Sequence, residues 1–133
     1  MTDAINLPNK PRILIVDDNV DAADTLALLF SHFDCDPVVA YSGPDALTRG
    51  HDLEPDLILL DIGMPGMDGF ETARRVRKTD WGKASRIAAL TAWGDDATHQ
   101  CIVLAGMDAH HVKPLRIEKI ADLVESLHAS RDG

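Results

Sequence analysis

The segment LILLDIGMPGMDG, residues 57–69, contains the pattern that decides the fold. Its first four residues are aliphatic and lack the alternation of apolar and polar side chains that marks a half-exposed strand. Such a run is typical of a strand buried on both faces, as in a parallel sheet between two layers of helices. One carboxylate, Asp61, ends the run, and a loop rich in glycine and proline follows it. We therefore expect a central strand over residues 57–60 with Asp61 at its carboxyl end.

Comparable aliphatic runs occur on both sides of this segment, separated by stretches with helical spacing. The other expected strands are residues 13–16, 38–40, 87–90 and 109–112, the last being the weakest because it contains His110 and His111. Apolar residues at separations of three and four predict the helices. These are expected to begin near Asn19, to run from a Ser42 cap to Gly50, to follow Gly69, to span 96–106 with Ala97, Cys101 and Leu104 inward, and to include Ile117, Ile120, Val124 and Leu127. The alternation predicts an α/β fold with a five-stranded, doubly wound parallel sheet.

Length, composition and charge exclude several classes of function. The chain has 133 residues, which predicts one domain, and its 45% hydrophobic and 26% charged residues are ordinary for a globular protein. Its formal net charge of −9 gives no general attraction for nucleic-acid phosphates or anionic membranes, so we expect no direct binding to either. No run approaches about 18 apolar residues and no secretory signal begins the chain, which favours a cytoplasmic location.

Several reactive or charged residues are expected to have no role in a site. Cys35 and Cys101 lack metal or redox spacing and are interpreted as buried thiols. The basic residues of the third helix are interpreted as its solvated face: Arg74, Arg75, Arg77 and Lys78. His110 and His111 are neighbours on a strand, so their side chains point to opposite faces and cannot chelate one metal ion.

Polar side chains gather where the expected strands end. In parallel sheets ligands bind beyond the carboxyl ends of the strands. The residues at those ends are Asp17, Asp18, Asp61, Thr91 and Lys113. Three carboxylates at low dielectric repel one another unless they hold protons or a cation. Because the expected ligands are all oxygens, Mg²⁺ is favoured over zinc, and Mn²⁺ is a second possibility.

This set of residues suits phosphoryl transfer. A carboxylate can attack phosphorus and form an aspartyl-phosphate, while a metal ion and a lysine neutralise the charge on the transferring group. Asp61 is the best candidate for the nucleophile because it stands alone at the end of a central strand. Lys113 offers a point charge and Thr91 a hydroxyl donor for the phosphoryl oxygens.

These residues resemble a receiver domain of the bacterial two-component response regulators. The resemblance covers residues 11–128, preceded by an extension over 1–10 and followed by a tail over 129–133. Its motifs are Asp17-Asp18, Asp61 with the loop Met64-Pro65-Gly66-Met67-Asp68-Gly69, Ala89-Leu90-Thr91-Ala92 and Val112-Lys113-Pro114. The resemblance implies the flavodoxin-like strand order 2-1-3-4-5 and a cis peptide bond between Lys113 and Pro114.

The resemblance also implies roles for individual residues. Mg²⁺ would be held by Asp17, Asp18, Asp61 and the carbonyl of Gly63, and Asp61 would take a phosphoryl group from a histidine kinase. We place the aromatic switch position of the family at His111, where it would follow the movement of Thr91 on phosphorylation. The output surface would then comprise the fourth helix, fifth strand and fifth helix, where Asp95, Thr98, His99 and His111 are expected, and Trp93 would shield the phosphoryl group from water.

The function predicted from the sequence is that of a stand-alone phospho-acceptor module, a signalling protein rather than an enzyme with rapid turnover. Its expected partners are a sensor histidine kinase or a histidine phosphotransfer protein, together with a downstream target protein. Met1 and the short polar tail favour a single-domain protein over a receiver excised from a hybrid kinase. A haloacid-dehalogenase-like phosphatase is the alternative, but such enzymes have a second aspartate where this chain has Gly63. A flavin or nucleotide binder would need a glycine-rich phosphate cradle, which the acidic strand-end loops lack.

Overall fold

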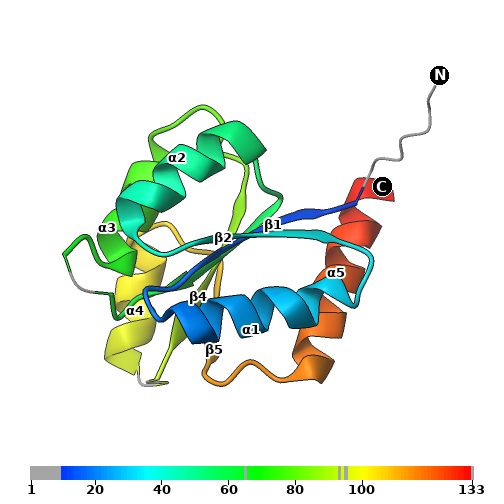
Figure 1. Ribbon diagram of the computed structural model, residues 1–133. Coiled ribbons are helices and arrows are strands. Elements are labelled where there is room, and N and C mark those ends of the chain that lie inside the picture. The colour runs from blue at the N-terminus through cyan, green and yellow to red at the C-terminus, as the bar shows by residue number, and fades with distance from the viewer. Residues whose placement is uncertain (1–9, 65, 93, 95, 133) are drawn as a thin grey trace.

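The computed structural model describes residues 10–64, 66–92, 94 and 96–132. These residues fold into one five-stranded parallel sheet with helices on both faces (Figure 1). The strands are β1 (Arg12–Val16), β2 (Asp36–Ala40), β3 (Leu57–Asp61), β4 (Arg86–Thr91) and β5 (Ala109–Val112). The helices are α1 (Val20–Ser31), α2 (Gly43–Leu53), α3 (Gly69–Arg77), α4 (Asp96–Leu104) and α5 (Ile117–Asp132). The sheet order is β2-β1-β3-β4-β5, so the predicted fold class and strand order are confirmed.

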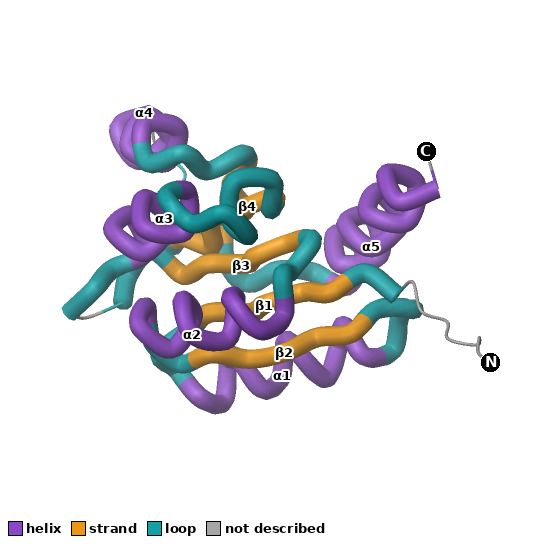
Figure 2. Tube along the Cα trace, turned by 90° about the horizontal axis from the view of Figure 1, so that it is seen from above, coloured by secondary structure: helices purple, strands orange, loops and turns teal. Residues whose placement is uncertain are grey.

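The sheet is covered on both faces, which explains why β1, β3 and β4 are largely aliphatic. One core cluster joins the sheet to residues of α2, α3 and α4, and the other joins it to residues of α1 and α5 (Figure 2). Alternate residues of β3 belong to opposite clusters, since Ile58 and Leu60 lie in the first and Leu57 and Leu59 in the second. All four are fully buried. No helix within the described ranges is both long and apolar enough to cross a membrane.

Side-chain caps fix the starts of the first three helices. Asn19, Ser42 and Asp68 each accept a hydrogen bond from a backbone N–H in the first turn of α1, α2 and α3. The predicted end of α2 at Gly50 is wrong, because the helix continues to Leu53 and Glu54 follows it in the left-handed conformation, with φ 51°. A Cβ atom at position 50 would collide with the Trp81 ring, so Gly50 serves packing instead.

The exposed face of α4 differs from the predicted one. Ile102 is the buried residue of the helix, while Cys101 is exposed and Leu104 is 84% exposed. The prediction of a buried thiol is therefore confirmed for Cys35 and wrong for Cys101. Burial raises the pKa of the Cys35 thiol to about 11, which makes it unreactive at neutral pH. Helix α5 also differs from its prediction, because it extends to Asp132, through most of the segment expected to be a tail.

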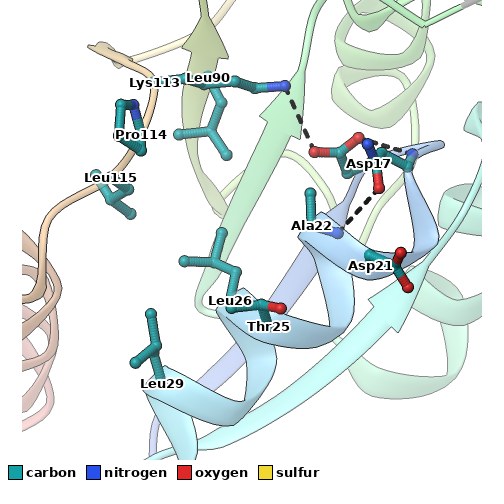
Figure 3. A pocket seen from close by; sticks show the side chains of 11 residues that line it. Asp17, Asp21, Ala22, Thr25, Leu26, Leu29, Leu90, Lys113, Pro114 and Leu115 are labelled. Carbon is teal, nitrogen blue, oxygen red and sulfur yellow. Dashed lines mark hydrogen bonds and ion pairs between the residues drawn. The ribbon is translucent and has the colours of Figure 1, made fainter.

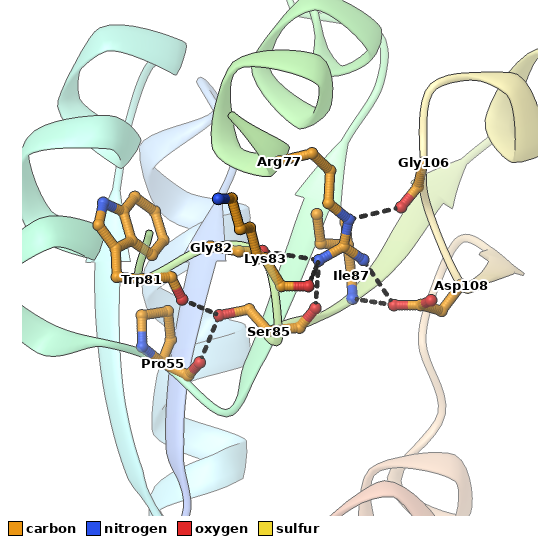
Figure 4. A network of polar contacts seen from close by, with 9 residues as sticks. All are labelled: Pro55, Arg77, Trp81, Gly82, Lys83, Ser85, Ile87, Gly106 and Asp108. Carbon is orange, nitrogen blue, oxygen red and sulfur yellow. Dashed lines mark hydrogen bonds and ion pairs between the residues drawn. The ribbon is translucent and has the colours of Figure 1, made fainter. Parts of the chain in front are cut away.

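Arg77 contradicts the prediction that the basic residues of α3 are all solvated. Its guanidinium donates to the carbonyls of Gly82 (2.7 Å), Ser85 (2.6 Å) and Gly106 (2.8 Å) and to the carboxylate of Asp108 (2.8 Å) (Figure 4). These groups belong to the loops before β4 and before β5. One side chain thus ties the carboxyl end of α3 to both loops, away from the strand ends that carry Asp61 and Lys113.

Candidate functional site

The carboxyl ends of the strands bring together the polar residues predicted from the sequence. Asp17 follows β1 directly, Asp61 and Thr91 are the last residues of β3 and β4, and Lys113 follows β5. The sheet ladder continues one residue past the strands, because the Asp17 N–H donates to the Ala40 carbonyl (3.1 Å) and the Lys113 N–H donates to the Thr91 carbonyl (2.8 Å). Backbone hydrogen bonds therefore position these side chains at one edge.

Three carboxylates lie close together at this edge. Asp17, Asp18 and Asp61 each offer an oxygen, and these oxygens lie within 4.8 Å of one another. Asp17 and Asp61 are buried, at 4% and 6% exposure, whereas Asp18 is exposed. Burial raises the pKa of Asp17, and the neighbouring Asp61 carboxylate raises it further, while the Asn19 N–H and Lys113 oppose the rise. The cluster has an excess of negative charge.

Lys113 lies between the two buried carboxylates. Its Nζ is 3.2 Å from Oδ2 of Asp61 and 3.5 Å from Oδ2 of Asp17 (Figure 3, which draws the contact with Asp17). The peptide bond between Lys113 and Pro114 is cis, as the resemblance implied.

The other oxygen of each buried carboxylate is held by the backbone. The Gly63 N–H donates to Oδ1 of Asp61 and the Asn19 N–H donates to Oδ1 of Asp17, both at 2.9 Å. Each carboxylate is thus oriented by the backbone N–H of the residue two positions later in the chain. Its other oxygen, Oδ2, is directed toward the ammonium group of Lys113. This arrangement fixes the Asp61 oxygen that faces the ammonium group.

The loop after β3 needs its last glycine. A Cβ atom at Gly69 would lie 2.5 Å from Cα of Ile62 and 2.7 Å from the carbonyl oxygen of Asp61. The start of α3 therefore rests directly against the backbone of the proposed nucleophile. Gly66 adopts a positive φ of 70°, which allows the chain to turn within the loop.

A mainly apolar cavity of about 510 Å³ adjoins the carboxylates (Figure 3). Asp17 and Lys113 lie at one end of it, and α1 and the segment after β5 form its sides. Its apolar lining includes Ala22, Leu26, Leu29, Leu90 and Leu115. Sequence reasoning missed this cavity, because its lining comes from segments far apart in the chain.

The two histidines of β5 differ in their surroundings. His110 contacts α4, with its Nδ1 3.2 Å from Nδ1 of His99. His111 points to the other face of the sheet, where Nε2 is buried without a hydrogen-bond partner in the described part of the chain. Burial lowers the pKa of His111, and the nearby charges of Lys119 and His110 lower it further. The contact between His99 and His110 was not predicted from the sequence. In the structure His110, and not His111, is the histidine of β5 that contacts His99 of α4.

The structure describes some of the remaining predicted site residues but not all of them. Thr91 is buried at the end of β4, and Gly63 lies two residues beyond Asp61 in the loop after β3. Thr98 is half-buried and His99 exposed, both on α4. Trp93 and Asp95 lie outside the described residues.

Comparison with known proteins identifies the family. The model of the response regulator receiver domain matches residues 13–125, so the chain belongs to this family. It is 34% identical over 119 residues to the transcriptional regulatory protein ResD of Bacillus subtilis and 36% identical over 106 residues to AfsQ1 of Streptomyces coelicolor. These matches cover 90% and 80% of the chain but 48% and 46% of the relatives. The chain thus spans about half the length of these relatives. The match to the receiver-domain family does not support the alternative of a haloacid-dehalogenase-like phosphatase.

Solved structures show the same fold. The chemotaxis protein CheY4 of Vibrio cholerae superposes with a TM-score of 0.84 at 24% identity, over 90% of this chain and 99% of that one. A response regulator of Chloroflexus aurantiacus superposes with a TM-score of 0.82 at 30% identity, over 91% of this chain and 99% of that one. The receiver domain of a histidine kinase from Syntrophus aciditrophicus, at 25% identity and a TM-score of 0.79, covers 90% of this chain and 91% of that one. The fold therefore occurs both in regulators and within a kinase.

Proposed function

We propose that the chain accepts a phosphoryl group on Asp61 with the help of Mg²⁺, or Mn²⁺ in its place. The observation that carries this proposal is the position of Lys113 between Asp61 and Asp17, with the Oδ2 atoms of both carboxylates toward the ammonium group. A nucleophilic oxygen, a cationic group and a cluster able to hold a metal ion are the components that phosphoryl transfer to a carboxylate needs.

The residues present fit a hard divalent cation. The three carboxylate oxygens within 4.8 Å of one another are donors that Mg²⁺ prefers, and a bound cation would neutralise the negative charge that these carboxylates share. In this proposal Asp17, Asp18, Asp61 and the Gly63 carbonyl hold the ion. When bound, it supplies Lewis-acid neutralisation of a phosphoryl oxygen.

The chain's own residues perform the transfer. An Asp61 carboxylate oxygen attacks phosphorus and forms an O–P bond. The bond from phosphorus to the donor breaks, and its electron pair leaves with the donor, which is the imidazole nitrogen of a phosphohistidine. Lys113 neutralises charge on the moving group, and Thr91 donates its hydroxyl to a phosphoryl oxygen. The Gly63 N–H keeps the Asp61 side chain oriented during the step.

Mass mapping after incubation with Mg²⁺ and acetyl phosphate tests the site. We expect one phosphoryl group on Asp61 and none in Asp61→Asn, whereas Asp45→Asn, which changes a half-buried carboxylate on α2 that is paired with Arg49, should label like the parent. Label that persists in Asp61→Asn at the parental rate would contradict the assignment.

In this proposal residues 11–128 form the working unit in the cytoplasm. Its phosphodonor is a sensor histidine kinase or a histidine phosphotransfer protein, and a downstream target protein binds the phosphorylated form. A pull-down with and without a phosphoryl analogue separates a switch from a relay intermediate, because only a switch has a partner selective for the phosphorylated form.

Thr91 and a histidine of β5 carry the change from the site to the surface in this proposal. The sequence assigns that role to His111, but the contact between His110 and His99 of α4 favours His110. Phosphorylation-dependent partner binding, compared between His110→Ala and His111→Ala, decides between the two residues. Loss in His111→Ala alone would restore the original assignment.

A further inference from the structure

We propose that His99 and His110 form a binding site for a divalent transition-metal ion, of the class of Zn²⁺, Ni²⁺ and Cu²⁺, which links α4 to β5. His99 belongs to α4 and His110 to β5. Their Nδ1 atoms lie 3.2 Å apart, and their ring centroids lie 5.0 Å apart with the planes tilted by 55°. The two ring nitrogens thus face each other across the junction of the helix and the sheet.

The separation of the nitrogens matches the needs of a shared metal ion. Two nitrogens bound to one tetrahedral zinc at about 2.0–2.1 Å are about 3.3 Å apart. Without a metal, the same contact requires one Nδ1 to carry a proton and the other to accept it. A metal ion binds both nitrogens in their unprotonated form, so it takes the place of the shared proton between the two rings.

Access and charge also favour a cation here. His99 is exposed and His110 is half-buried, so water can reach the ion and complete its coordination. Asp96, which is exposed, lies one helical turn before His99. With a net charge of −9, the chain attracts cations generally, and the Asp96 carboxylate adds to that attraction near His99.

The proposed site is chemically distinct from the carboxylate cluster. Imidazole ligands select transition metals, whereas Mg²⁺ prefers oxygen ligands. His111 cannot join the site, since it points to the opposite face of the sheet. Because its two ligands come from different elements, the site exists only in the folded chain, and the bound ion should stabilise the fold.

Calorimetric titration of the whole chain with Zn²⁺, in the presence of excess Mg²⁺, tests the proposal independently of phosphorylation. We expect one Zn²⁺ per chain, with affinity reduced at least tenfold in His99→Ala and in His110→Phe. Two matched controls, His51→Ala at an exposed position of α2 and His111→Phe on the other face of β5, should bind like the parent. Saturating Zn²⁺ should raise the Tm of the parent by about 3 °C but not that of His99→Ala.

Equal Zn²⁺ affinity in the parent, His99→Ala and His110→Phe would overturn the proposal. So would binding that disappears in Asp18→Asn, since the ion would then occupy the carboxylate cluster. His99 is exposed on the helix, so His99→Ala keeps the test valid if His110→Phe fails to fold.

Discussion

The ammonium nitrogen of Lys113 lies 3.2 Å from Oδ2 of Asp61, although β4 separates β3, which ends at Asp61, from β5, which Lys113 follows. The contact therefore spans the end of β4, where Thr91 is buried. Because the same ammonium group is 3.5 Å from Asp17, it offsets part of the charge of both buried carboxylates. Lys113 thus occupies the position from which it can both stabilise the metal-free cluster and neutralise a group arriving at Asp61.

Replacing Lys113 by methionine should separate these two effects. We expect the initial rate of Asp61 phosphorylation to fall by about 100-fold, the scale of losing one charge-stabilising group in a transition state. Mg²⁺ should bind at least as tightly as in the parent, because a competing cation is gone. Phosphorylation kinetics and Mg²⁺ titration measure the two quantities. Lys83→Met, which removes an exposed lysine near Asp80, is the control, and parental kinetics in Lys113→Met would refute the role.

Asp18 offers the cleanest test of the metal cluster, because it is exposed while Asp17 is tied to the backbone at Asn19. Asp18→Asn should weaken Mg²⁺ binding at least tenfold. It should also raise the free energy of unfolding of the metal-free protein by about 0.5 kcal/mol, since one of three repelling carboxylates is removed. Thermal melts with Mg²⁺ and with chelator report both effects. A lower Tm than the parent in chelator would show that Asp18 is structural.

The sequence was sufficient for the features that depend on local pattern. The buried strands follow from aliphatic runs, the start of α2 follows from its Ser42 cap, and the residues at strand ends follow from the rule that parallel strands end at one edge. That rule placed Asp17, Asp61 and Lys113 together without any knowledge of distances. The order of the strands came from the resemblance to receiver domains, not from the residues alone.

The features that were missed depend on contacts between distant segments. A glycine such as Gly50 is typical of a helix terminus. Its packing role becomes visible only in the structure, where the Trp81 ring lies directly against it. The carbonyls that bind Arg77 come from residues 82, 83, 85 and 106, so no pattern within α3 marks this arginine as different from Arg75. His99 and His110 are likewise joined only by the packing of α4 on β5.

Arg77 should contribute far more to stability than its neighbours on α3. Its side chain is 22% exposed, and Arg77→Met would remove hydrogen bonds to four backbone carbonyls and the ion pair with Asp108. We expect the free energy of unfolding to fall by about 2–3 kcal/mol. Arg75→Met breaks only an exposed pair with Glu71 and should change it by no more than about 0.5 kcal/mol. Denaturant titrations compare the two variants. Equal losses in the free energy of unfolding would contradict the stabilising role of the Arg77 contacts.

His111 should make the stability of the protein depend on pH. Its pKa is lowered in the folded state, first by burial and then by the charges of Lys119 and His110, so the unfolded chain binds a proton more readily than the folded one. The contribution of His111 to stability is therefore fully present above its unfolded pKa of about 6.5, and is lost as the pH falls through the lowered folded value.

Phenylalanine at position 111 provides the test, since it keeps a ring but cannot take a proton. His111→Phe also removes the buried Nε2, which has no hydrogen-bond partner within the described residues. We expect it to raise the free energy of unfolding at pH 8 and to weaken the loss of stability between pH 7 and 5. His51→Phe, at an exposed site on α2, should leave that loss unchanged. Denaturant midpoints at several pH values measure both variants. A pH profile for His111→Phe parallel to that of the parent would mean that another group binds the proton, because the cost of charging a buried imidazole cannot remain once the imidazole is gone.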